Sequence, residues 1–265
     1  MLGETVQALS VTGHGIEGDR VWAAIDLQTG KVASAKRANL WRSLLQCEAR
    51  LTSAAAFEVS LPGGVTLSAG DPLLDERLSA LTGRQIALSR NPPEGAEVER
   101  SHPEAVLAEG LDVAVAYDPL RLGGGAPPGT FLDYAPIHLI TSATLDGLIG
   151  LTPDDEPIEE IRYRANIVIR SPEGAAPFPE NAWVGGVIRF GGTVALRVIL
   201  PTPRCAIPAL AHGALRTQPA ALLRAIQHNR IEVQGFGNLP AAGVYLDVLA
   251  GGAITEGDRV TLEAA

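Results

Sequence analysis

Residues 187–205 have the sequence Val-Ile-Arg-Phe-Gly-Gly-Thr-Val-Ala-Leu-Arg-Val-Ile-Leu-Pro-Thr-Pro-Arg-Cys, which indicates two strands followed by a thiol. The runs 187–190 and 194–200 are apolar and rich in β-branched residues, and Gly191-Gly192 lies between them. A Gly-Gly pair between two such runs is typical of a β-hairpin. The stretch therefore predicts a hairpin whose second strand leads directly to Arg204 and Cys205.

The rest of the chain shows the same pattern of short apolar runs separated by Gly and Pro, which favours a β-rich α+β fold. Closing such strands into a barrel would remove their exposed edges. Further strands are predicted at 5–12, 20–26, 31–35, 57–61, 65–67, 136–141, 161–169, 244–248 and 259–262. Helices are predicted at 72–81, with Gly83 as the C-terminal cap, from Ser142 as N-cap through Leu148, and at 217–228 with Leu222, Leu223 and Ile226 facing inward.

Composition divides the chain into two predicted parts and a connection. Residues 91–103 are rich in Pro, Glu and Arg, and residues 123–129 read Gly-Gly-Gly-Ala-Pro-Pro-Gly. We therefore expect an N-terminal module at 1–90, a connecting segment at 91–134 and a second domain at 135–265. The glycine run has no Gly-Lys-Ser/Thr after it, so it does not predict a phosphate-binding loop.

Charge and composition exclude several classes of protein. The 265 residues carry a net charge of −9, which argues against nucleic acid as a partner. Two cysteines, Cys47 and Cys205, cannot supply the ligands of an ordinary iron–sulfur cluster. No apolar run approaches the roughly 20 residues that span a bilayer, and the first residues do not resemble a signal peptide. We therefore expect a cytoplasmic protein with no membrane partner.

Cys205 is the strongest candidate for chemistry. A neighbouring arginine favours thiolate over thiol, and the thiolate is the form that binds soft metals or carries sulfur. A small buried core residue is the alternative, and we expect that role for Cys47. A protease-like pair of Cys205 with His138 or His212 stays possible but has no local support. Zinc-type spacing among the histidines is absent.

Several arginines have the chemistry to hold a phosphate. Arg20 follows Gly18-Asp19 at a predicted strand, while Arg162 and Arg164 alternate along the run 161–169 and should share one face of it. Asn166, two residues further, should lie on the same face and could meet a polar heteroaromatic ligand. Surface ion pairs are the alternative, because the chain also carries 30 acidic residues. With only Lys31 and Lys36 available, pyridoxal chemistry is not expected.

Taken together, six short motifs resemble those of MOSC domain proteins, named after the C-terminal domain of molybdenum cofactor sulfurase. They occur in the family's order over nearly the whole chain. The first, with Asp26 shortly after it, is similar to the β-barrel module that precedes the domain in relatives such as the mitochondrial amidoxime-reducing component. The motifs are Gly18-Asp19-Arg20-Val21-Trp22, Pro136-Ile137-His138-Leu139-Ile140-Thr141-Ser142, Arg162-Tyr163-Arg164-Ala165-Asn166-Ile167-Val168-Ile169, Trp183-Val184-Gly185, Pro203-Arg204-Cys205 and Gly257-Asp258-Arg259-Val260.

The resemblance implies a MOSC-type β-barrel after a smaller β-barrel-like module with a few helices, and a pterin-type molybdenum cofactor. It assigns Cys205 as metal ligand and catalytic residue. It implies an oxidoreductase that reduces N-hydroxylated or related small molecules with electrons from a separate donor protein. Residues expected around the cofactor are Arg20, Ser142, Arg164, Asn166 and Arg204.

Two departures from the family keep other functions open. The family usually has a Lys-Ser pair upstream of the position matching Gly3, whereas this sequence begins Met1-Leu2-Gly3, so weaker cofactor binding is one expectation. A ferredoxin module found in some bacterial relatives is also absent, which is why we expect a separate electron donor. The alternatives are a sulfur carrier with a persulfide on Cys205, or a cofactor-binding module without redox turnover.

Overall fold

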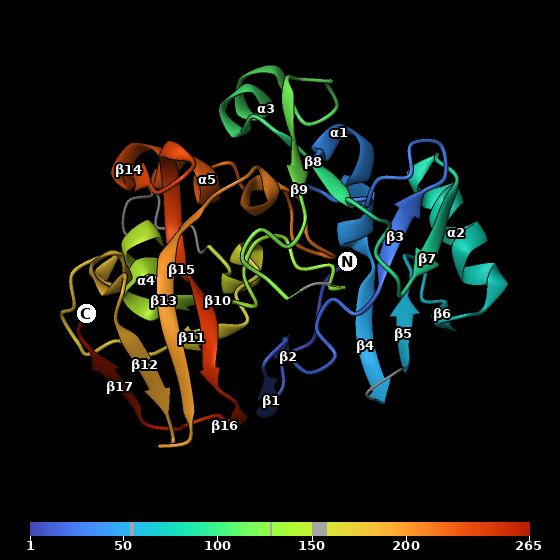
Figure 1. Cartoon of the computed structure of the whole chain (residues 1–265). Helices are drawn as coiled ribbons and strands as arrows, with labels where there is room; N and C mark the ends of the chain where they lie inside the picture. The colour runs from blue at the N-terminus through green and yellow to red at the C-terminus, as the bar shows by residue number, and fades with distance from the viewer. Residues whose placement is uncertain (54–55, 128, 150–157) are drawn as a thin grey trace.

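The computed structural model of the chain describes residues 1–53, 56–127, 129–149 and 158–265. One position of the predicted connection and short pieces of the two predicted domains lie outside the described residues. Figure 1 shows a large sheet on one side of the molecule and a smaller β-rich module on the other. The β-rich α+β class is confirmed by the order of elements. None of the described helices is long and apolar enough to cross a membrane.

The large sheet is built around the hairpin predicted at 187–200. Its order is β11-β10-β15-β13-β12-β17, with β14 paired to β15. Three register shifts between β13 and β15 bend the sheet into a half-barrel. Its inner side is filled by side chains such as Ile137, Leu196 and Val244. The strands are β10 (Ile137–Thr141), β11 (Ile167–Ile169), β12 (Val187–Phe190), β13 (Val194–Pro203), β14 (Arg230–Val233), β15 (Gly237–Ala250) and β17 (Val260–Glu263).

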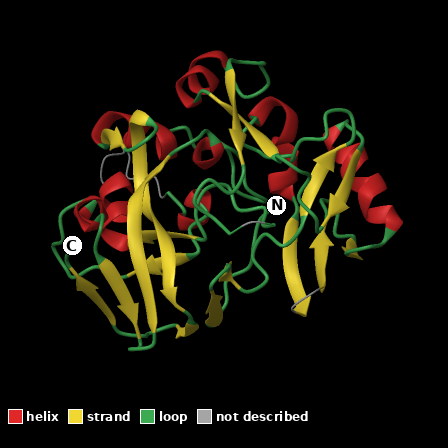
Figure 2. Ribbon diagram, in the orientation of Figure 1, coloured by secondary structure: helices red, strands yellow, loops and turns green. Residues whose placement is uncertain are grey.

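Helices and single turns pack around this sheet (Figure 2). They are α4 (Ser142–Ile149), α5 (Ala220–His228), η2 (Glu160–Tyr163), η3 (Pro179–Trp183) and η4 (Ile207–Ala209). The predicted helix at 217–228 begins at Ala220; Leu222 is buried as expected, but Leu223 is exposed. The predicted cap of α4 is also wrong by one residue, because the Thr141 hydroxyl accepts the hydrogen bond from the Thr144 amide.

The smaller module follows the sequence prediction in part: the helix at 72–81 and the strands at 20–26, 57–61 and 65–67 are found to within a few residues, whereas 31–35 forms no strand and the elements at 38–41, 42–46, 48–53 and 86–89 were not predicted. Helix α2 (Pro72–Thr82) begins after Asp71, whose carboxylate accepts from the Leu73 amide, and ends at Gly83 in the left-handed conformation. Cys47 is fully buried in the module's core, as predicted. The other elements are β3 (Ala23–Asp26), α1 (Ala38–Trp41), η1 (Arg42–Gln46), β4 (Glu48–Ser53), β5 (Ala56–Ser60), β6 (Thr66–Ser68) and β7 (Ile86–Ser89).

Two further β units join the halves. Strand β1 (Ala8–Thr12) pairs with both β2 (Gly15–Ile16) and β16 (Gly252–Thr255), so the first and last parts of the chain share one sheet. The segment 91–134 contains secondary structure that the sequence did not predict, namely β8 (Glu97–Ser101), α3 (Pro103–Glu109) and β9 (Tyr117–Arg121). The boundaries at 90 and 134 stay predictions.

The run 161–169 is the largest error of the sequence prediction. Only Ile167–Ile169 forms a strand, while Glu160–Tyr163 is a 3₁₀ turn that ends at Arg164 with φ of 54°. Arg162 and Arg164 therefore do not share a strand face. The buried Arg162 guanidinium donates to the carbonyl oxygens of Leu210 (2.9 Å) and Arg216 (2.8 Å), whereas Arg164 lines a cavity.

Candidate functional site

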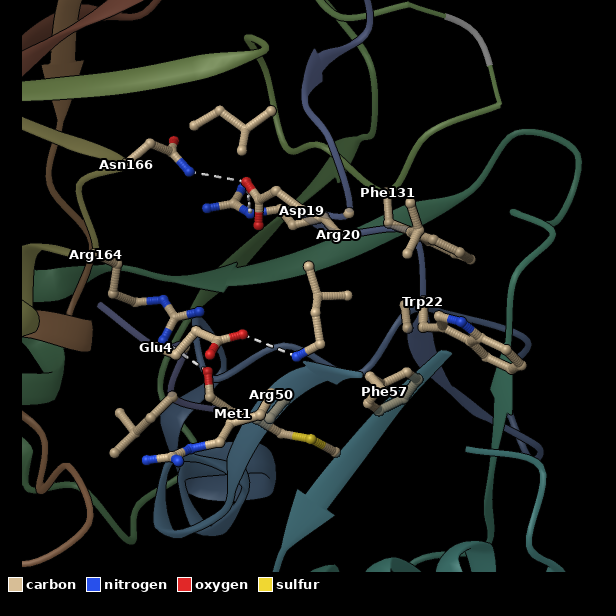
Figure 3. Close-up of a pocket in the computed structure, with 18 of the residues that line it drawn as sticks. Met1, Glu4, Asp19, Arg20, Trp22, Arg50, Phe57, Phe131, Arg164 and Asn166 are labelled. Atoms are coloured by element: carbon tan, nitrogen blue, oxygen red, sulfur yellow. Dashed lines mark hydrogen bonds and ion pairs between the residues drawn. The ribbon is translucent and has the colours of Figure 1, made fainter. Parts of the chain in front are cut away.

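A cavity of about 780 Å³ lies between the small module and the half-barrel. Figure 3 shows Arg164 and Asn166 on one side of this cavity and Trp22, Phe57 and Phe131 on the other. Of the residues predicted to surround a cofactor, Arg20, Arg164 and Asn166 line it. The fold thus brings together side chains from the turn after β2 and from the loop between η2 and β11.

The turn after β2 places Arg20. Gly18 and Arg20 both have positive φ, 82° and 52°, so the chain makes a tight reversal there. A positive φ is costly for a non-glycine residue and is often found at functional sites. Arg20 Nη1 lies 3.4 Å from Oδ2 of Asp133, which holds the guanidinium at the cavity.

Asn166 connects the two halves of the site. Its Nδ2 donates to Oδ2 of Asp19 at 2.9 Å, and its Oδ1 accepts from the His138 amide at 3.0 Å. Its own amide donates to the His138 carbonyl at 2.8 Å. The side chain is therefore fixed between the start of β10 and the turn that carries Arg20.

Lys36 and Asp133 form an ion pair that the sequence prediction missed. Lys36 Nζ lies 2.9 Å from Asp133 Oδ2. Burial alone would raise the pKa of Asp133, but Lys36 and Arg20 hold that pKa at about 2. Burial opposes the charge of Lys36, yet Asp133 raises its pKa above the ordinary value. Both groups are therefore charged at neutral pH.

Arg164 has a backbone partner but no carboxylate within ion-pair distance among the described residues. Its Nη1 donates to the Met1 carbonyl at 2.8 Å. Burial, followed by the neighbouring charge of Arg20, lowers its pKa. Arg20 and Lys36 pair with Asp19 and Asp133 at this end of the cavity, which we call the cationic end. The cavity is also lined by Arg50, Glu4, Glu17 and Glu160, so its lining as a whole has no excess of positive charge. Of the three cations at this end, Arg164 is the one that suits an anionic ligand, because its charge has no carboxylate at ion-pair distance among the described residues.

Cys205 lies directly behind this cationic end. Its side chain is 6% exposed and packs with Ala35 and Ile207, two residues that also line the cavity. Its sulfur is close enough to Lys36 and Arg164 to be among the neighbours that raise the pKa of each. The thiol is thus beside the cations rather than in the open cavity. Among the described residues, no group of three or more His, Cys, Asp or Glu side chains could hold a metal ion.

Arg204 and Ser142, also predicted near the cofactor, do not line the cavity. The Arg204 guanidinium donates to the carbonyls of Ala242 (3.1 Å) and Tyr163 (3.0 Å) and lies 3.3 Å from Nε2 of His138. Ser142 Oγ accepts from the Ser171 amide at 3.0 Å. Here Arg204 stabilises the loop before Cys205 and Ser142 stabilises the start of α4; their cofactor roles stay predictions.

Lys36 and Asp133, which the sequence prediction missed, have only weak signals in the sequence. Lys36 is one of two lysines in the chain, a scarcity that could have marked it. Asp133 lies in the predicted connection, and its partners Arg20 and Lys36 are far from it in sequence. No local pattern predicts such a cluster, because the fold alone brings its members together.

Acid is expected to weaken the fold through Asp133. Its pKa is lowered from 3.8 to about 2 in the folded protein, so its ionisation contributes about 2 kcal/mol above pH 4. That contribution disappears as the pH falls from about 4 to about 2. Urea unfolding of wild type and Asp133→Asn across this range should show the difference between their free energies of unfolding becoming smaller as the pH falls. A difference in free energy of unfolding that does not change with pH would contradict the lowered pKa of Asp133.

The fold and site combine a β-rich domain, a cavity with Arg20, Lys36 and Arg164 at one end, and one thiol beside that end. Residues 127–261, more than half of the chain, match the family model of the MOSC domain, and the chain belongs to that family. The predicted family and the MOSC-type barrel after a smaller β module are thereby confirmed. The family is associated with the molybdenum cofactor, which supports a cofactor-binding role.

Comparison with solved structures finds similarity to YiiM from Geobacillus stearothermophilus. The similarity has 16% sequence identity and a TM-score of 0.34, and covers 48% of this chain and 54% of that protein. The chain thus matches about half the length of that structure. Comparison with curated proteins finds no match.

Proposed function

We propose that the protein binds a pterin-type molybdenum cofactor and reduces N-hydroxylated small molecules with electrons from a separate donor protein. The observation that carries the proposal is the cationic end of the cavity with Cys205 beside it. The Arg164 guanidinium, which has a backbone partner but no carboxylate at ion-pair distance among the described residues, suits the cofactor's phosphate. A single thiol suits a soft metal that brings its other sulfur ligands with it.

The chemistry of these residues supports such a cofactor. Arg20 and Arg164 would hold the phosphate, Asn166 would meet the polar edge of the pterin, and Cys205 would bind the metal. When bound, the cofactor supplies a metal that cycles between oxidation states, while the protein supplies position and charge. A volume of about 780 Å³ lies within the range of sites that enclose a ligand of this kind.

Lys36 and His138 differ in their protonation states, and therefore in what they can do during the reduction. Converting N–OH to N–H and water consumes two electrons and two protons. Lys36 keeps its positive charge because Asp133 raises its pKa, so it has no proton to take up during the reduction. Burial, followed by Arg204, lowers the pKa of His138 well below the ordinary value, so His138 is neutral at pH 7 and has no imidazolium proton to give.

Molybdenum content of Cys205→Ser tests the proposal. Wild type from a cofactor-competent host should contain near-stoichiometric molybdenum and reduce acetohydroxamic acid with a reduced dye as donor. Cys205→Ser should lose both, because a hydroxyl is a poor ligand for a soft metal. Cys47→Ser is the matched control, since Cys47 is fully buried in the core of the small module.

The outcomes separate the alternatives. Molybdenum missing from wild type would contradict the proposal, and a persulfide on Cys205 by mass spectrometry would then identify a sulfur carrier. Molybdenum present without reduction of any N-hydroxylated compound would identify a binding module without turnover. Equal metal content in Cys205→Ser and wild type would contradict the role of Cys205.

A further inference from the structure

The unit formed by β8, α3 and β9 lies against the loop that carries Cys205. Figure 1 shows this unit between the large sheet and the small module. Val106 of α3 and Val115, which lies between α3 and β9, are buried and belong to the same apolar cluster as Cys205. The unit therefore covers the thiol on one side, although the sequence indicated only a connection there.

Strand β8 also makes hydrogen bonds to the two backbone segments that carry the thiol and Lys36. Arg100 Nη2 donates to the carbonyl of Arg204 at 2.9 Å, and this carbonyl belongs to the peptide bond that leads into Cys205. The next residue, Ser101, donates its amide to the carbonyl of Lys36 at 3.1 Å. Two adjacent residues of one strand thus hold the backbone of both groups.

The Arg100 guanidinium has no ion pair among the described residues. Asp118, its partner in the register with β9, and Glu104 in α3 each contact another basic side chain. A charged donor makes a stronger hydrogen bond to a carbonyl than a neutral donor does. The charge of Arg100 is therefore available to strengthen its bond to the Arg204 carbonyl.

The residue before the thiol is held from two sides. The Arg204 amide donates to the carbonyl of Pro240 in β15 at 2.7 Å, and the Arg204 carbonyl accepts from Arg100 in β8. A ligand side chain has to be held to within about 0.5 Å of its working position, and supporting hydrogen bonds provide that precision. Loss of Arg100 would leave this backbone held only by β15.

We infer that Arg100 is a positioning residue for Cys205. Its guanidinium fixes the peptide bond that leads into the thiol, so that the sulfur keeps one place beside the cationic end. Arg100 does not line the cavity and therefore acts through this peptide bond. The inference rests on the proposed function where the metal is concerned, and on the hydrogen bond alone where the place of the thiol is concerned.

Alkylation of the two cysteines tests the inference without any metal. The full chain, as wild type and as Arg100→Gln, is prepared from a host that cannot make the cofactor and is treated with iodoacetamide. Peptide mass spectrometry then follows Cys205 and Cys47 separately. Cys205 should react about fivefold faster in Arg100→Gln, because a buried thiol reacts when its surroundings open. Cys47, fully buried in the small module, should react as in wild type.

The ratio of the two alkylation rates separates positioning from stability, since a less stable fold would expose both cysteines. Arg100→Lys, which keeps the charge and a donor, should restore most of the protection of Cys205. Arg121→Gln is the matched control, because Arg121 lies exposed on β9 in the same unit. An unchanged ratio in Arg100→Gln, or an equal change in Arg121→Gln, would overturn the inference.

The molybdenum-loaded enzyme provides a second readout. The kcat of Arg100→Gln for acetohydroxamic acid should fall about fivefold with KM unchanged, because the groups that line the cavity are untouched. Wild type without molybdenum, together with a raised ratio in Arg100→Gln, would refute the proposed function and support the positioning role. Molybdenum and turnover in wild type, together with an unchanged ratio, would support the proposed function and overturn the positioning role.

Discussion

Gly243→Ala is expected to destabilise the protein by about 3 to 5 kcal/mol and to lower its melting temperature by about 10 °C. Gly243 lies in β15, where this strand pairs with β10, and has φ of 79°. An added methyl group would lie 2.5 Å from Nε2 of His138 and still closer to the carbonyl oxygen of Leu139. Both the conformation and the contact oppose any larger residue.

Gly235→Ala provides the matched control for this prediction. Gly235 has nearly the same φ, 83°, but an added methyl group would meet nothing within 4 Å. Its replacement should therefore cost only the strain of the left-handed conformation, about 1 to 2 kcal/mol. Thermal and urea unfolding of both variants measure the difference. Equal losses would show that β15 can shift away from β10 without penalty.

Arg162→Gln is expected to lower the stability of the fold and to leave ligand binding intact. Arg164→Gln is expected to leave stability nearly unchanged and to weaken ligand binding. Arg162→Gln removes a buried guanidinium that donates to two carbonyls and to Oε2 of Glu159 at 2.5 Å. It should cost about 3 kcal/mol, because the carbonyls of Leu210 and Arg216 lose their donors. Properly folded Arg162→Gln should still bind the cofactor.

Arg164→Gln should change the free energy of unfolding by less than about 1 kcal/mol. Burial and Arg20 lower the pKa of Arg164, so the fold itself disfavours this charge. Its molybdenum content and its affinity for inorganic phosphate should nevertheless fall at least tenfold, because the lost group donates charge-assisted hydrogen bonds to an anion. Calorimetric titration with phosphate and elemental analysis test this. Unchanged phosphate binding would refute the cationic site.

The elements that local sequence determines were predicted well. The hairpin around Gly191-Gly192 and the helix from Pro72 with its cap at Gly83 follow from turn chemistry and periodicity, and both are confirmed. The run 161–169 failed because its alternation of apolar and basic residues is typical of a strand. Long-range hydrogen bonds from Arg162 and the left-handed conformation of Arg164 determine its structure instead.

Only part of the candidate site could be predicted from the sequence. Family motifs pointed to Arg20, Arg164 and Asn166, and the fold brings these three to one cavity. Lys36 and Asp133 belong to no chemical motif, and they meet because the turn before α1 and the segment before β10 converge on the turn that carries Arg20. The hairpin of β8 and β9 was missed for a related reason, since its polar composition resembles that of an exposed connection.

The pairing of β1 with β16 has a consequence for how the chain acquires its structure during synthesis. Leu9 leaves the ribosome long before its partner Ile254, because almost the whole of both modules lies between them in the sequence. Contacts this distant in sequence slow folding, and domains otherwise tend to fold in the order of their translation. The sheet that contains β1 therefore cannot be completed until β16 has been translated, and until then the edge of β1 that β16 covers stays open to other chains.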